Sequence, residues 1–211
     1  MKMKKTTTLF TVMLAVFAFT ACGQATKAKQ KPSASKANVA KFRTGAEQIE
    51  IYLPLLKGKR VAILANQTSI IGKETTVDSL LKRGVNFVKI FGPEHGFRGN
   101  ASAGIHVDDD IDAKTGIKAI SLYGKHNTPT KEELADVDVV IFDVQDVGVR
   151  FYTYINTLQH LMEACAVNNK ELMIFDRPNP NGFYIDGPIL DPKYKSGIGI
   201  QPIPVVHGLT V

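Results

Sequence analysis

Glu94 is the acidic side chain whose position in the sequence best suits catalysis. It lies between Pro93 and His95, where an apolar run passes into a turn flanked by glycines. Proline restricts the backbone there, and glycine allows a ligand to approach the chain closely. A partly desolvated carboxyl group in such a turn could serve as a general acid. The residues leave an equal alternative open, in which Glu94 is a loop carboxylate that pairs with Arg98.

Further acids and three arginines follow the apolar runs. Asp143 could supply a second carboxylate or could cap the segment that follows it. A guanidinium group binds a carboxylate through two parallel hydrogen bonds, so each arginine could clamp an acidic substrate. Alternatively, the arginines pair with acids of the protein itself. The arginines are Arg98, Arg150 and Arg177, and the acids available to them are Asp143, Asp146 and Asp176.

Aromatic residues and histidines in the same segments allow further interpretations. Phe97 and Tyr152 could stack on a sugar ring or could simply pack within loops. His95, His106 and the acids at 108–110 could be imagined as metal ligands. The two histidines lack i,i+4 helical spacing, and the acidic run is more simply a solvated loop. We therefore expect no metal site.

The signatures of several common active sites are missing from the sequence. The turn after the first apolar run, at 65–69, lacks the glycine-rich pattern of a dinucleotide site, and there is no P-loop. There is also no G-x-S-x-G elbow, which disfavours a serine hydrolase. NAD, FAD and ATP are therefore disfavoured, and we expect no cofactor.

The elements that must position these residues are indicated by the spacing of apolar side chains. Near-continuous Val, Ile, Leu and Phe runs are typical of strands covered on both faces, as in parallel sheets. Helical patterns lie between the runs, and Thr130 with Glu133 forms a capping-box pattern. The predicted strands are 60–66, 87–91, 117–122, 137–142 and 172–175. The predicted helices are 46–56 (disturbed by Pro54), one from Thr75 or Thr76 to before Gly84, one that begins at Thr130, and 154–165.

This alternation predicts an α/β fold with a Rossmann-like, doubly wound and mainly parallel sheet in residues 42–211. Such sheets bind ligands beyond the carboxyl ends of their strands, and polar residues gather at those ends here. The segment 92–116 has no clear secondary structure, and a loop of that length is usually functional. Cys165 lies on the apolar face of a helix, where we expect a buried, inert thiol.

The N-terminal segment has the pattern of a lipoprotein export signal. Residues 1–21 combine a short basic start with an apolar run that is too short to span a bilayer. Small residues precede Cys22, as at a bacterial lipidation site, so we expect acylation of Cys22 and a membrane-anchored, exported protein. An ordinary secreted protein with an incidental cysteine is the alternative. Residues 22–41 are rich in Lys, Ala and Ser and read as a solvated tether.

The positive charge of the chain belongs to this N-terminal part. The formal charge is +6, of which the signal carries three lysines and the tether five, which leaves −2 for residues 42–211. A mildly acidic domain gives no support for nucleic-acid binding. The sequence makes no prediction about the oligomeric state.

Several segments together resemble a bacterial family, the exo-β-N-acetylmuramidases, long catalogued as a domain of unknown function. The resemblance extends in order through essentially all of residues 42–211. Its longest and most specific segments are PEHGFRG at 93–99 and DVQDVGVRFYTY at 143–154. The other matching segments are 44–47, 64–69, 176–180 and 187–188.

The resemblance implies a glycoside hydrolase that removes N-acetylmuramic acid from the non-reducing end of peptidoglycan fragments. It also implies a Rossmann-like catalytic domain, truncated here at its C-terminal end, and a smaller C-terminal domain that is missing from this chain. Glu94 matches the family's proposed catalytic glutamate. Asp143 or Asp146 would act as base or nucleophile, or would orient Glu94. A carboxyl separation of about 5 Å predicts retention of configuration, and about 6.5–9.5 Å predicts inversion.

The residue types fit such a substrate. The lactyl carboxylate of N-acetylmuramic acid suits Arg98, Arg150 or Arg177. The other residues expected to bind the sugar are Asn66, His95, Gln145, Asp146, Tyr152, Asp176 and Asn179. Two alternatives remain open: a lipoprotein that captures muropeptides or sugars without turnover, and a metal-dependent amidase or deacetylase.

Overall fold

The computed structural model describes residues 42–99 and 109–211. The predicted signal peptide, Cys22 and the tether therefore lie outside the described residues, as do His106 and Asp108. Within the described part, no helix is both long and apolar enough to cross a membrane.

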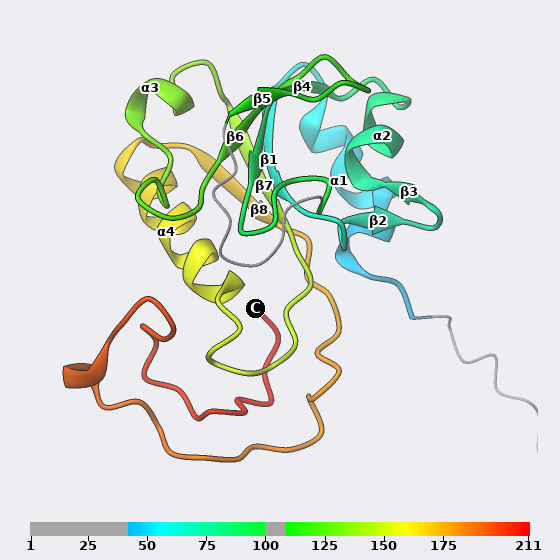
Figure 1. The fold of residues 1–211 in the computed structure, drawn as a ribbon. Helices are drawn as coiled ribbons and strands as arrows, with labels where there is room; N and C mark the ends of the chain where they lie inside the picture. The colour runs from blue at the N-terminus through cyan, green and yellow to red at the C-terminus, as the bar shows by residue number, and fades with distance from the viewer. Residues whose placement is uncertain (1–41, 100–108) are drawn as a thin grey trace, which may run out of the picture. The chain divides into compact units, whose positions relative to one another are not determined.

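A six-stranded sheet forms the centre of the described domain (Figure 1). All neighbouring strands are parallel except the edge pair β5 and β6, which is antiparallel. The predicted α/β fold with a mainly parallel sheet is thus confirmed. In spatial order the strands are β5 (Asp110–Ile111), β6 (Lys118–Ser121), β4 (Asn86–Gly92), β1 (Arg60–Ala65), β7 (Val139–Asp143) and β8 (Glu171–Ile174).

Helices cover both faces of the sheet, as expected for a doubly wound fold. One layer holds the 3₁₀ helix η1 (Gly45–Glu47), α1 (Ile49–Leu56) and α2 (Thr76–Leu81), and the other holds α3 (Lys131–Leu134) and α4 (Tyr154–Val167). Alternate residues of β1 point to opposite faces of the sheet and pack against different helix layers. Val61 and Ile63 pack with the first, and Ala62 and Leu64 pack with the second.

Helix starts follow local capping chemistry. Thr130 and Glu133 form the predicted capping box, with the Thr130 hydroxyl accepting from the Glu133 N–H at 3.2 Å. At α2 the cap is Thr75, whose hydroxyl oxygen accepts from the Asp78 N–H at 3.2 Å. These caps fix where each connection enters its helix.

Three short strands and the 3₁₀ helix η2 were not predicted. A hairpin of β2 (Ile70–Ile71) and β3 (Glu74–Thr75) leads into α2, and β5 lies inside the segment that the sequence indicates as a long loop. A two-residue strand shows no alternation that a pattern could detect. After β8 the chain runs to Val211 mostly without regular structure, apart from the 3₁₀ helix η2 (Pro192–Tyr194).

Candidate functional site

Glu94 lies in a tight turn directly beyond the carboxyl end of β4. The turn closes through a hydrogen bond from the Gly96 N–H to the Pro93 carbonyl at 2.8 Å. His95 adopts a left-handed backbone conformation with φ of 71°, which is unusual for a residue with a side chain. Strain of this kind tends to occur at functional sites. Both Glu94 and His95 are half-buried.

Glycine is required where β4 enters this turn. A Cβ added at Gly92 would lie 2.9 Å from the backbone nitrogen of Phe97, because the turn folds back onto the end of the strand. Phe97 itself is buried in the hydrophobic core. Phe97 therefore packs inside the protein and is not placed to stack on a sugar ring. The turn that carries Glu94 is held by Gly92 at its start and by buried Phe97 at its end.

Tyr123 and Tyr154 contact Glu94 at the carboxyl edge of the sheet. The side chain of Tyr123, just beyond β6, is hydrogen-bonded to the Glu94 carboxylate, and this bond raises the pKa of Tyr123. The Tyr154 hydroxyl, on the first turn of α4, donates to the Glu94 carbonyl at 3.5 Å. Burial raises the pKa of Tyr154 to about 12. Tyr152 packs edge-on against Tyr154, with ring centroids 4.9 Å apart.

Asn66 lies behind this cluster, at the end of β1, and is only 1% exposed. Its side-chain oxygen accepts hydrogen bonds from the Thr68 N–H at 2.8 Å and from the Thr68 hydroxyl at 2.6 Å. Its amide nitrogen has no hydrogen-bond partner among the described residues. The Asn66 side chain nevertheless lies close to Tyr154, and this contact opposes the rise in the pKa of Tyr154. Asn66 therefore shapes the turn beneath the tyrosines.

Asp143 and Arg177 form a buried ion pair. Asp143 is fully buried; one carboxylate oxygen accepts from Arg177 Nε at 2.7 Å and the other from the Thr76 hydroxyl at 2.6 Å. Burial raises the pKa of Asp143 although the arginine opposes the rise. Arg177 also donates to the Ile70 carbonyl at 3.1 Å. Arg177 therefore pairs with an acid of the protein itself, which is the alternative that the sequence left open for it.

Arg98 is held by other acids. Its guanidinium binds Asp112 through two hydrogen bonds of 2.9 and 2.8 Å and lies 3.5 Å from Asp78. The hydrogen bonds from Arg98 hold the pKa of Asp112 below its usual range. Arg98 thus ties the segment after β4 to the residues that follow β5.

The remaining polar candidates connect loops. Arg150 donates to the carbonyls of Pro188 at 2.9 Å and Ile203 at 2.5 Å. Gln145 donates to the carbonyls of Asp146 at 2.6 Å and Pro178 at 2.9 Å. These contacts join the connection after β7 to the segment after β8.

Asp146 pairs with His207, a residue that the sequence did not indicate. Both residues are 4% exposed, and His207 Nε2 lies 3.4 Å from an Asp146 carboxylate oxygen. His207 Nδ1 accepts from the Leu209 N–H at 3.2 Å, which assigns the imidazole proton to Nε2, facing Asp146. Burial raises the pKa of Asp146. The two residues are 61 positions apart in the chain, so no local pattern could have joined them.

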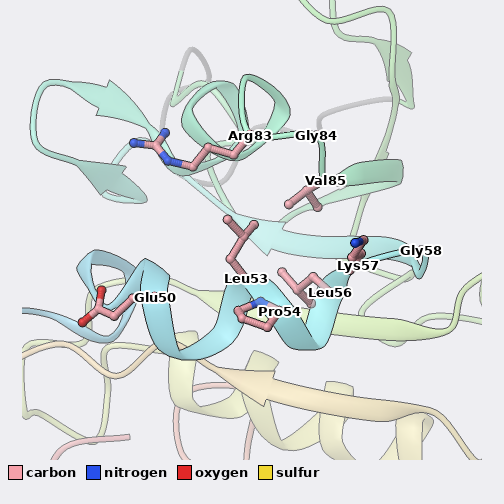
Figure 2. Close-up of a pocket in the computed structure, with 9 residues that line it drawn as sticks. All are labelled: Glu50, Leu53, Pro54, Leu56, Lys57, Gly58, Arg83, Gly84 and Val85. Atoms are coloured by element: carbon pink, nitrogen blue, oxygen red, sulfur yellow. The ribbon is translucent and has the colours of Figure 1, made fainter.

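The surface of the described domain contains several hollows. One, of about 610 Å³ near the end of β8, is lined in part by Asp176, Arg177 and Asn179, which brings three predicted residues together. Another, of about 530 Å³, lies where β1 and β4 begin, at the edge of the sheet opposite Glu94. Figure 2 shows that the apolar side chains of Leu53, Leu56 and Val85 gather in it.

Neither the metal interpretation nor a reactive thiol gains support from the geometry. Among the described residues, no group of three or more His, Cys, Asp or Glu side chains could hold a metal ion. Cys165 is buried, and burial raises its pKa to about 11. A buried thiol with a raised pKa is unreactive.

The fold and the cluster at its edge define a doubly wound α/β protein that carries its polar candidate site beyond the carboxyl ends of the strands. Comparison with known families narrows this class. Residues 61–211 match the family described as "Exo-beta-N-acetylmuramidase NamZ, N-terminal", and the chain belongs to that family.

Individual relatives agree with this assignment. A Bacillus subtilis (strain 168) protein named peptidoglycan beta-N-acetylmuramidase NamZ is 42% identical over 213 residues, covering 99% of this chain and 51% of the relative. Two crystal structures of DUF1343 family proteins from Bacteroides fragilis NCTC 9343 are also similar. One is 50% identical with a TM-score of 0.70, covering 79% of this chain and 43% of its own. The other is 42% identical with a TM-score of 0.72, covering 80% and 43%. The chain spans about half the length of the curated relative that it matches.

Proposed function

We propose that the protein acts as an exo-acting glycoside hydrolase that releases N-acetylmuramic acid from the non-reducing end of peptidoglycan fragments during cell-wall turnover. Glu94 is the general acid. The observation that carries this proposal is the position of Glu94, in a strained turn at the ligand-binding edge of the sheet and in hydrogen-bond contact with Tyr123. Membership of the exo-β-N-acetylmuramidase family supports the reaction class.

The proposed chemistry follows the usual course of glycoside hydrolysis. Glu94 protonates the glycosidic oxygen as the sugar develops oxocarbenium character. The tyrosine hydroxyls nearby stay protonated over the working pH range, because the pKa of Tyr123 and that of Tyr154 are both raised. They therefore act as hydrogen-bond donors toward oxygen atoms at this edge. Asp143, with both oxygens engaged by Arg177 and Thr76, acts by positioning the end of β7.

Arg150 is our proposed contact for the lactyl carboxylate of the sugar. Arg98 and Arg177 are neutralised by Asp112 and Asp143. The hydrogen bonds of the Arg150 side chain go instead to carbonyl oxygens, and within residues 42–99 and 109–211 no carboxylate compensates its positive charge. A substrate carboxylate would provide that compensation.

A chromogenic substrate pair tests this function. Full-length protein is incubated with matched glycosides of N-acetylmuramic acid and N-acetylglucosamine, which differ by the lactyl group. We expect release from the muramic acid glycoside and a large loss of that release rate in Glu94→Gln. In Arg150→Ala the ratio of the release rates for the two sugars should become smaller. Absence of release, or undiminished release by Glu94→Gln, would refute the proposal. Binding without turnover would favour a sugar-capturing protein instead.

We further propose that Cys22 is lipidated and that residues 22–41 tether the domain to a membrane. A flexible coil of this length reaches about 25 Å, which keeps the domain close to cell-wall fragments. Cells fed a labelled fatty acid should incorporate label into the protein and not into a Cys22→Ala variant. Equal labelling of both would contradict the anchor.

A further inference from the structure

The register of two neighbouring strands brings Tyr123 to Glu94. β4 and β6 are parallel neighbours, and Gly92 is paired with Ser121 at the end of their ladder. The ladder continues by one hydrogen bond, from the Leu122 N–H to the Gly92 carbonyl at 2.8 Å. Glu94 and Tyr123 each lie two residues beyond the last pair, and their side chains meet in the hydrogen bond described above.

We propose that Tyr123 is a positioning residue for Glu94. Its hydroxyl donates to the Glu94 carboxyl group and thereby fixes the orientation in which that group presents its proton to the leaving group. This inference rests on the proposed function, because it gives Tyr123 a purpose only where Glu94 acts as an acid. Nothing in the family match or in the names of the relatives assigns a role to this tyrosine.

The proton balance explains why a donor is needed at this place. When the glycosidic bond breaks, its electron pair goes to the leaving oxygen, which takes the proton from Glu94. A water molecule supplies the new hydroxyl at the sugar carbon, and the proton that it loses passes to the solvent, from which Glu94 is later reprotonated. Glu94 is left as a carboxylate, and a hydrogen bond from Tyr123 stabilises that charged form. The donor thus acts more strongly after proton transfer than before it.

Tyr154 also contacts Glu94. Tyr154 holds the main chain of Glu94 through its carbonyl, whereas Tyr123 holds the side chain. Tyr123 beyond β6 and Tyr154 on α4 are thus two titratable groups that face Glu94 from the described elements. Tyr152 packs against Tyr154, and His95 follows Glu94 in the same turn. Since these phenols stay neutral, Tyr123 can only donate to a charged carboxylate.

The experiment compares Tyr123→Phe with a matched control, Tyr194→Phe. Tyr194 is 68% exposed and lies in η2, outside the cluster. Two quantities are measured on full-length protein: the pH profile of kcat/KM for the muramic acid glycoside, and the ¹³C NMR titration of the Glu94 carboxyl carbon. Glu94→Gln assigns the NMR signal, and melting temperatures check that each variant is folded.

For Tyr123→Phe we expect kcat to fall about tenfold, the magnitude of one lost hydrogen bond to a charged group. The alkaline limb of the profile and the NMR titration of Glu94 should both move to higher pH. Tyr194→Phe should change neither. A folded Tyr123→Phe protein that matches Tyr194→Phe in kcat, in profile and in NMR titration would overturn the inference.

Failure of the proposed function gives a different result. In that case wild-type protein releases no sugar, whereas Tyr123→Phe still moves the NMR titration of Glu94, since the hydrogen bond does not depend on turnover. Movement of the acidic limb instead of the alkaline limb would show that Glu94 works as a base. That outcome would overturn both the acid role and the positioning role proposed for Tyr123.

Discussion

At the scale of single residues, most of the polar side chains in the family segments hold the fold together around Glu94. Arg177 and Asp143 neutralise one another inside the sheet layer, and Arg98 is engaged by Asp112 and Asp78. Such pairs are weak evidence for stability, but breaking one leaves a buried charge without compensation. This distinction yields a test of the role of Asp143.

Asp143→Asn should lower the free energy of unfolding by about 3–5 kcal/mol, because Arg177 would remain buried without a counter-charge. The matched control is Asp138→Asn, whose partner Arg60 is half-exposed and whose loss should cost about 0–1 kcal/mol. Urea unfolding measures both. Equal and small losses, accompanied by loss of activity in Asp143→Asn alone, would instead favour a direct catalytic role for Asp143.

The sequence indicated which residues could be catalytic, but it did not indicate which residues contact them. It placed Glu94 at a strand end, because the proline and glycines around it are local signals. It could not indicate that Tyr123 and Tyr154 flank Glu94, since Tyr154 falls on an apolar helix face and looks like a core residue. His207 was missed because its partner Asp146 lies far away in the chain.

At the scale of elements, the connection from β7 to α4 positions the tyrosines. It includes the left-handed residue Gly148, whose N–H donates to an Asp146 carboxylate oxygen at 2.8 Å. A Cβ at Gly148 would lie 2.3 Å from the side chain of Asn179. That side chain is itself held by a hydrogen bond to the Leu209 carbonyl at 2.8 Å. A side chain at position 148 would therefore have to displace Asn179.

Gly148→Ala should therefore destabilise the protein more than Gly124→Ala. Both glycines have nearly the same backbone conformation, with φ of 76° and 77°, but Gly124 has open space around its Cβ position. The left-handed conformation costs about 1–2 kcal/mol in either variant, so any excess loss in Gly148→Ala reports the contact with Asn179. Thermal unfolding makes the comparison, and equal losses would show that Asn179 moves aside without cost.

The main strands and the longest helix could be predicted because their apolar runs are long. Where the runs are short, the prediction failed: β2, β3 and β5 have two residues each. Their existence depends on pairing with strands elsewhere, such as Asp110 with Ala119 in the antiparallel edge pair. Propensity cannot reveal such pairing.

At the scale of the whole molecule, the doubly wound sheet explains why residues from distant parts of the sequence meet at one edge. The ends of β1, β4, β6 and β7 deliver Asn66, Glu94, Tyr123 and Asp143 to that edge. Under the proposed function, the formal charge of −2 in residues 42–211 would leave recognition of an anionic sugar to individual cations, and Arg150 is our proposed one.

The most direct test of the general-acid role compares two leaving groups. Full-length wild-type protein and Glu94→Gln are given a dinitrophenyl glycoside of N-acetylmuramic acid, whose phenolate leaves without protonation, and a disaccharide whose sugar alcohol requires a proton. We predict that Glu94→Gln loses disaccharide hydrolysis by about 10²–10⁴-fold and retains most hydrolysis of the dinitrophenyl glycoside. Equal losses on both substrates would contradict the assignment of Glu94 as the acid.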